Sequence, residues 1–113
     1  MININVDEGY AYDFLAILDL KRNKNLKNSK ENFDLCNDFI KHQVGDELHT
    51  EIINSIEYKN LLKANEETFD AVEMARYGSI SAKEVDNLNM KRYYLKVDLQ
   101  KKFFSSKIME QKT

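Results

Sequence analysis

The sequence contains no proline and only three glycines in 113 residues. Proline and glycine most often end helices and shape tight turns, so a β-rich domain with frequent turns is disfavoured. A chain of this length is the size of one ordinary domain, and its 42% hydrophobic residues can form one core. We therefore predict a single all-α domain over residues 1–113, an antiparallel bundle of about four to five helices with a long C-terminal helix.

The spacing of apolar residues predicts the first helices. One stripe with helical spacing predicts a helix over residues 8–22 whose buried face carries Tyr10, Phe14, Ile17 and Leu18. The Asn-rich segment 23–30 is expected to be a loop, with Asn28 or Ser29 capping a second helix that ends at Gly45. Beyond Gly45 apolar residues continue at helical spacing. Ser55 either begins a new helix there or lies within one bent helix.

The C-terminal half shows the clearest helix boundaries. A helix from about Tyr58 is expected to end at Gly78, and Ser81 and Glu84 form the SxxE capping box of the last helix. That helix is expected to continue through Phe103 toward Ile108. Helices this long cannot bury both faces in so short a chain, so an end that projects beyond the bundle needs a second subunit. We therefore predict a homodimer.

Charge, cysteine content and hydropathy limit the partners. The net charge of −2 argues against a nucleic-acid binder, although the segment from Lys83 onward has eight basic and four acidic residues. This basic segment either packs on the acidic remainder or offers a surface to an anionic ligand or protein partner. With the single Cys36, no apolar run of about 20 residues and no signal-like start, we expect a cytoplasmic protein without a membrane partner.

Polar residues interrupt two stripes that should otherwise be apolar: Asn65 and Arg76 in one helix, and Arg92 in the last. Such residues often fix the register of helices, and on that interpretation Arg92→Leu should leave the fold intact or stabilise it. The functional alternative is a pocket for an anionic small molecule. Its candidate residues are Asp13, Asp70, Glu73, Arg76, Arg92 and Lys96.

Carboxylates also share one helical face at Glu66, Asp70 and Glu73. Carboxylates at this spacing can hold Mg²⁺ in helical nucleotide pyrophosphatases, so a Mg²⁺-dependent phosphate-cleaving enzyme is the alternative function. No catalytic motif supports it, and we expect no cofactor or metal. His42 and His49 lie seven residues apart without a cysteine at zinc-ligand spacing, and we expect both at the surface or its boundary.

Three blocks of the sequence resemble an uncharacterised family of short helical bacterial and viral proteins, classed as a domain of unknown function. The first runs from Gly9 and Asp13 to Lys21, and the second from Asn65 through Phe69 to Arg76. The third contains Asn89, Arg92, Lys96 and Leu99, followed by Ser106, Glu110 and Lys112. Phe69, Val72 and Met90 depart from the tryptophan, glutamate and aspartate that the family favours at these positions.

The resemblance implies a small all-helical protein without an assigned reaction or substrate. It points to Asn65, Arg76 and Arg92, which also interrupt the apolar stripes, and it adds Asn89 to the candidate ligand-binding residues. Together the observations favour a helical binding or assembly module that forms a homodimer, with a polar seam that lines a small-ligand pocket.

Overall fold

The computed structural model describes residues 2–104. Within that range it forms five α-helices and no strand: α1 (Glu8–Asn23), α2 (Ser29–Val44), α3 (Asp46–Ile53), α4 (Ile56–Arg76) and α5 (Ala82–Phe103). The all-α prediction is confirmed, and α5 is the long C-terminal helix that the sequence predicts.

Side-chain caps begin three of these helices. Asp7, Ser55 and Ser81 precede α1, α4 and α5, and the side chain of each accepts a hydrogen bond from the backbone N–H three residues later. Such caps satisfy amide groups that have no partner within the helix. Of the predicted capping box, the cap by the Ser81 hydroxyl is confirmed, while the Glu84 carboxylate lies 3.5 Å from that hydroxyl. Ser55 caps the start of a new helix, which decides between the two alternatives that the sequence left open.

Two glycines separate helices. Gly45 lies between α2 and α3 with φ of +100°, and Gly78 follows the end of α4 with φ of +72°. Other residues rarely adopt these angles because their Cβ atoms would clash with the backbone. Both predicted helix ends are therefore confirmed, whereas the expected extension of the last helix toward Ile108 lies outside the described residues.

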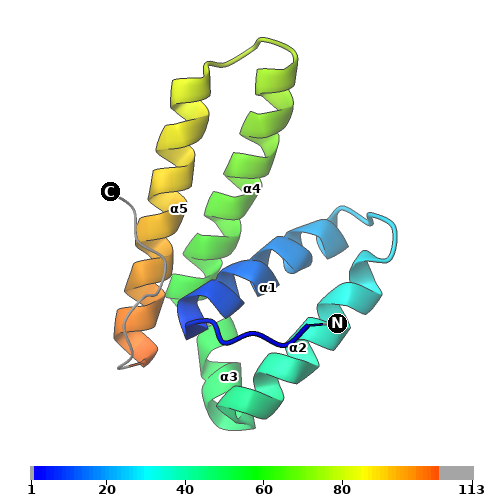
Figure 1. Ribbon diagram of the computed structural model, residues 1–113, viewed down its shortest axis with the longest axis vertical. Helices are drawn as coiled ribbons and strands as arrows, with labels where there is room; N and C mark the ends of the chain where they lie inside the picture. Colours follow the sequence, from blue (N-terminus) through cyan, green and yellow to red (C-terminus); the bar gives the residue numbers. More distant parts are fainter. Residues whose placement is uncertain (1, 105–113) are drawn as a thin grey trace.

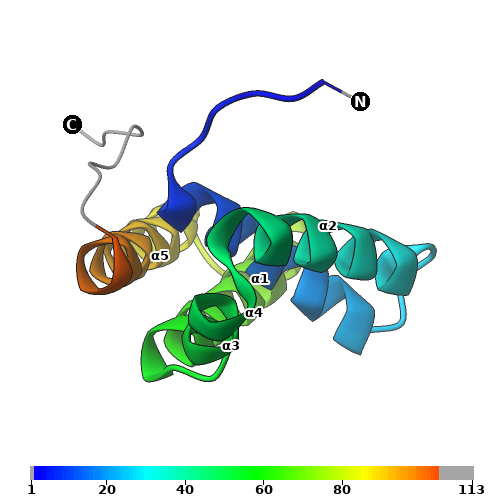
Figure 2. The ribbon, with the colours of Figure 1, turned by 90° about the horizontal axis from the view of Figure 1, so that it is seen from below.

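The helices form two antiparallel pairs that cross at an angle. In Figure 1, α4 and α5 run side by side as a long hairpin, while α1 and α2 form a second pair inclined to it, with α3 at the base. Figure 2 views the same arrangement from below. Helix α1 packs against α2, α4 and α5, and only the lower part of the α4–α5 hairpin is covered.

The hydrophobic core lies where α1 crosses the lower part of the hairpin, and all five helices contribute to it. Its buried residues are Tyr12, Leu15, Ala16, Ile40, Ile52, Tyr58, Leu61 and Leu99. The stripe predicted for the first helix is wrong in part, because Tyr10 and Phe14 are 45% and 49% exposed. Helix α1 has neighbours on several sides, so tertiary packing rather than the apolar stripe decides which residues it buries.

None of the described helices combines the length and the apolar character that crossing a bilayer requires.

Candidate functional site

A buried polar cluster joins α1, α4 and α5. Asn65 Nδ2 donates to Asp13 Oδ1 at 3.0 Å and to the Leu61 carbonyl oxygen at 3.0 Å, and Arg92 Nε lies 3.6 Å from the same Asp13 oxygen. Asp13 and Asn65 are buried, while the Arg92 side chain is 31% exposed. Asn65 and Arg92, two of the three polar residues that interrupt the predicted stripes, therefore meet at one carboxylate, an arrangement that fixes how the three helices align.

Two residues in the next turns of α5 contact the start of α1. Lys96 is buried, and its ammonium nitrogen lies 5.8 Å and 5.4 Å from the ring centroids of Tyr10 and Tyr93. Gln100 Oε1 accepts a hydrogen bond of 2.6 Å from the backbone N–H of Gly9. Gln100 carries no sequence signal as a candidate, because its role depends on a contact between residues 91 positions apart.

The remaining candidate residues do not join this cluster. Asp70 pairs with Lys24 at 3.6 Å, and Glu73 pairs with Arg76 at 3.4 Å on the exposed part of α4. Asn89 is half-buried on α5, one turn before Arg92. The structure thus brings Asp13, Asn65 and Arg92 together, with Lys96 one turn away, but it does not gather all the candidate residues around one pocket.

The proposed Mg²⁺ carboxylates gain no support from the geometry. Glu66 is exposed, and Asp70 and Glu73 already form ion pairs with basic side chains. Within residues 2–104, no group of three or more His, Cys, Asp or Glu side chains is arranged to hold a metal ion. A Mg²⁺ site of this kind would also need carboxylates on a facing helix, and residues 2–104 do not bring such a set together.

A second polar network lies in the core, and the sequence did not point to it. The Tyr12 hydroxyl lies 2.8 Å from His49 Nδ1, and His49 Nε2 lies 2.7 Å from Asn37 Oδ1. The expectation of a surface or boundary His49 is wrong, because this residue is buried between α1 and α2. Burial lowers the pKa of His49, with a further lowering by Lys41 and an opposing effect of Asp46.

A third network ties the far end of α1 to its neighbours. Asp19 accepts hydrogen bonds from the Tyr58 hydroxyl at 3.1 Å and from Arg22 Nη2 at 2.5 Å. The Arg22 guanidinium lies over the Phe33 ring, 3.9 Å from its centroid. Burial and the Asp19 carboxylate raise the pKa of Tyr58, so this phenol remains a hydrogen-bond donor. Arg22 is thereby held in place at the end of α1.

The upper part of the α4–α5 hairpin is a feature of a different kind. From Val72 to Leu95 no residue is buried. Large apolar side chains are exposed to solvent there, including Val72, Met74 and Tyr77, the last of which is 83% exposed. Two paired helices can cover only the faces that they turn to each other, so the outer faces of this segment lack a core to pack on.

Charge differs between the two helices over a stretch of the hairpin that is longer than this upper segment. Residues 66–76 of α4 contain four acidic residues and one basic residue, whereas residues 82–96 of α5 contain four basic and two acidic residues. Lys91 Nζ on α5 already pairs with Glu67 on α4 at 3.2 Å. The acidic stretch of α4 thus lies mostly before Val72. Within Val72 to Leu95, α4 has one acidic and one basic residue, and α5 has three basic and two acidic residues.

Comparison of the chain with protein-family models, curated proteins and solved structures finds no match. The resemblance to the uncharacterised helical family stays a prediction.

Proposed function

We propose that the protein is a helical assembly module that acts as a homodimer through the upper segment of its α4–α5 hairpin. The observation that carries this proposal is the run from Val72 to Leu95, where two long helices have no buried residue and expose large apolar side chains. Several large apolar side chains exposed along one segment are a feature of many interaction sites.

The charge pattern favours a second copy of the chain as the partner. In a two-fold dimer the same patch of both subunits forms the interface, so the patch must complement itself. If two hairpins pack antiparallel, the acidic stretch of α4 at residues 66–76 in one copy can face the more basic α5 of the other. The Asp13–Asn65–Arg92 cluster supports this role, because it fixes the hairpin on α1 and presents it as a rigid element.

Size-exclusion chromatography with light scattering tests the proposal. At tens of micromolar we expect a mass twice that of the 13.3 kDa chain. The double variant Val72→Gln/Tyr77→Gln removes apolar surface without changing charge, and it should be a folded monomer at the same concentration.

The matched control is Leu35→Gln/Phe39→Gln. These residues are also exposed and apolar, but they lie on α2, away from the hairpin. The control variant should remain dimeric. A monomeric wild-type protein, or an equal effect of both double variants, would contradict the proposal.

A further inference from the structure

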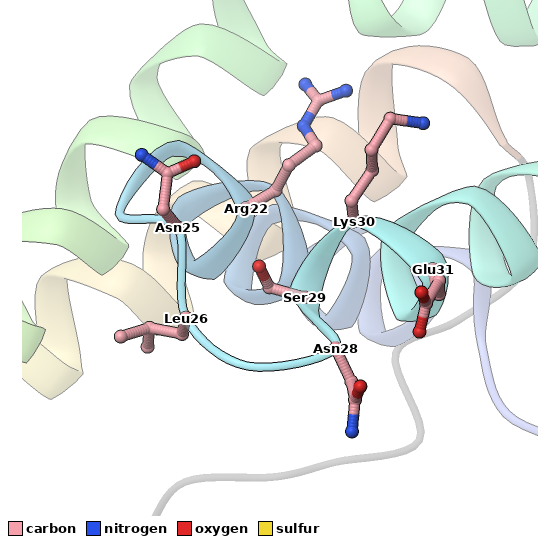
Figure 3. Close-up of a pocket in the computed structure, with 7 residues that line it drawn as sticks. All are labelled: Arg22, Asn25, Leu26, Asn28, Ser29, Lys30 and Glu31. Atoms are coloured by element: carbon pink, nitrogen blue, oxygen red, sulfur yellow. The ribbon is translucent and has the colours of Figure 1, made fainter.

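A hollow with a volume of about 240 Å³ lies at the turn between α1 and α2. It is lined by Arg22, Asn25, Leu26, Asn28, Ser29, Lys30 and Glu31, which are the sticks of Figure 3. Its volume is below the roughly 300–1,000 Å³ of sites for drug-sized ligands, so only a small ligand fits it. This hollow lies outside the polar cluster and outside the hairpin segment.

Ser29 is the unusual residue of this hollow. It is only 6% exposed, and its backbone N–H donates to the Leu26 carbonyl oxygen at 3.0 Å. Its hydroxyl forms no hydrogen bond with the residues that the structure describes, although it lines the hollow. The hydroxyl oxygen is not fully enclosed, so it can hydrogen-bond to water or to a ligand in the hollow.

The first turn of α2 adds backbone donors. Asn28 precedes the helix in the left-handed conformation and provides no side-chain cap. The N–H groups of Lys30 and Glu31 make no hydrogen bond with a described residue, as expected for the first turn of a helix. Free amides and the partial positive charge at a helix N-terminus together favour an anion.

Two cations stand beside these donors. The Arg22 guanidinium is held by Asp19 and by the Phe33 ring, which leaves other N–H groups of its five for a ligand. Lys30 pairs with Asp34 at 2.8 Å, but its side chain is 80% exposed, so this pair contributes little and can open. In Figure 3 the heads of Arg22 and Lys30 lie on the same side as the Ser29 hydroxyl, whereas the Glu31 carboxylate points away.

We propose that this hollow binds one phosphate-sized oxyanion, with the Ser29 hydroxyl and the first-turn amides of α2 as donors and Arg22 and Lys30 as the cations. The oxyanion is either free inorganic phosphate or the phosphate group of a small phosphomonoester, since both present the same acceptor oxygens. This inference is independent of dimerisation through the hairpin.

A titration of the ¹⁵N-labelled full chain with inorganic phosphate, followed by NMR, tests the proposal. Sodium chloride holds the ionic strength constant. We expect saturable shifts of the amide resonances of Ser29, Lys30 and Glu31. Ser29→Ala and Lys30→Gln should each weaken binding about fivefold, the effect expected for the loss of one hydrogen bond to a ligand.

Lys27→Gln is the matched control, because Lys27 is an exposed lysine of the same loop that does not line the hollow. It should bind phosphate as the wild type does. Shifts that do not saturate, shifts that chloride reproduces, or equal weakening by Lys27→Gln and Lys30→Gln would overturn the proposal. A parallel titration with glycerol phosphate identifies the source, since tighter binding than inorganic phosphate indicates an ester and weaker binding indicates the free anion.

Discussion

Individual residues of α1 carry much of the polar structure inside this protein. Asp13, Tyr12 and Asp19 lie on one helix, yet their hydrogen-bond or ion-pair partners include residues on α3, α4 and α5. A buried polar group is tolerated only when it has such a partner. These contacts therefore make the interior sensitive to the loss of one member of a pair.

Replacement of Arg92 tests that dependence. If Arg92 only fixed register, Arg92→Leu would be neutral or stabilising. The structure instead shows the buried Asp13 beside Arg92, so among the described residues the variant would leave this carboxylate with Asn65 as its side-chain partner. We expect unfolding free energy to fall by about 1–3 kcal/mol in urea denaturation.

Lys91→Leu is the matched control, because its pair with Glu67 is exposed and should contribute no more than about 0.5 kcal/mol. The double variant Asp13→Asn/Arg92→Leu should lose less unfolding free energy than the sum of the losses in the two single variants, because it leaves no buried charge without a partner. Additive costs would contradict the pairing.

His49 gives the protein a pH dependence with a definite sign. Its pKa in the folded state is below the usual 6.5, mainly because of burial, although Asp46 opposes the shift and Lys41 adds to it. As the pH falls below about 6.5, the unfolded chain binds a proton that the folded chain excludes. His49 should therefore reduce stability at pH 5.5 relative to pH 7.5.

Urea midpoints at the two pH values measure this effect. In His49→Gln the loss on acidification should be smaller than in the wild type, whereas His42→Gln, at the other and exposed histidine, should behave as the wild type does. An unchanged pH dependence in His49→Gln would show that other groups cause it.

At the scale of elements, the contact between α1 and α5 depends on a residue without a side chain. A Cβ atom at Gly9 would lie 3.1 Å from the Lys96 carbonyl oxygen and 3.2 Å from Gln100 Oε1. The helices can approach closely enough for the Gly9–Gln100 hydrogen bond because this space is empty.

Gly9→Ala should therefore destabilise the protein by about 1–3 kcal/mol, even though alanine favours helices. Thermal unfolding followed by circular dichroism measures the change. Asn60→Ala, at an exposed position of α4, gains helix propensity without a clash and should be neutral or slightly stabilising. A stabilised Gly9→Ala variant would mean that α5 can move away from α1 at little cost.

At the scale of the whole molecule, buried residues are unevenly distributed. The core lies at one end, and the hairpin extends beyond it with its apolar side chains exposed. If the proposed dimer forms, association stabilises the folded state by mass action.

The melting temperature should then rise when the protein concentration is raised tenfold, and it should not rise in Val72→Gln/Tyr77→Gln. Differential scanning calorimetry over that range makes the comparison. A melting temperature independent of concentration in the wild-type protein would indicate that the hairpin is stable without a second copy.

The sequence by itself determined the helices of this protein. Capping residues, glycines and apolar period are local signals, so the cap at Ser81 and the helix ends at Gly45 and Gly78 could be identified from neighbouring residues, whereas a helix start at Ser55 was one of two alternatives. The polar interruptions at Asn65 and Arg92 were also visible, because they break an apolar pattern.

Only the tertiary structure decided which partners those residues meet. The carboxylate beside Arg92, the burial of His49 and the contact of Gly9 with Gln100 join positions far apart in the chain. The exposure of Tyr10 and Phe14 has the same origin, since the angle at which α1 crosses the hairpin selects its buried face. Helical periodicity reports that a face is apolar, whereas the packing of other helices determines what covers it.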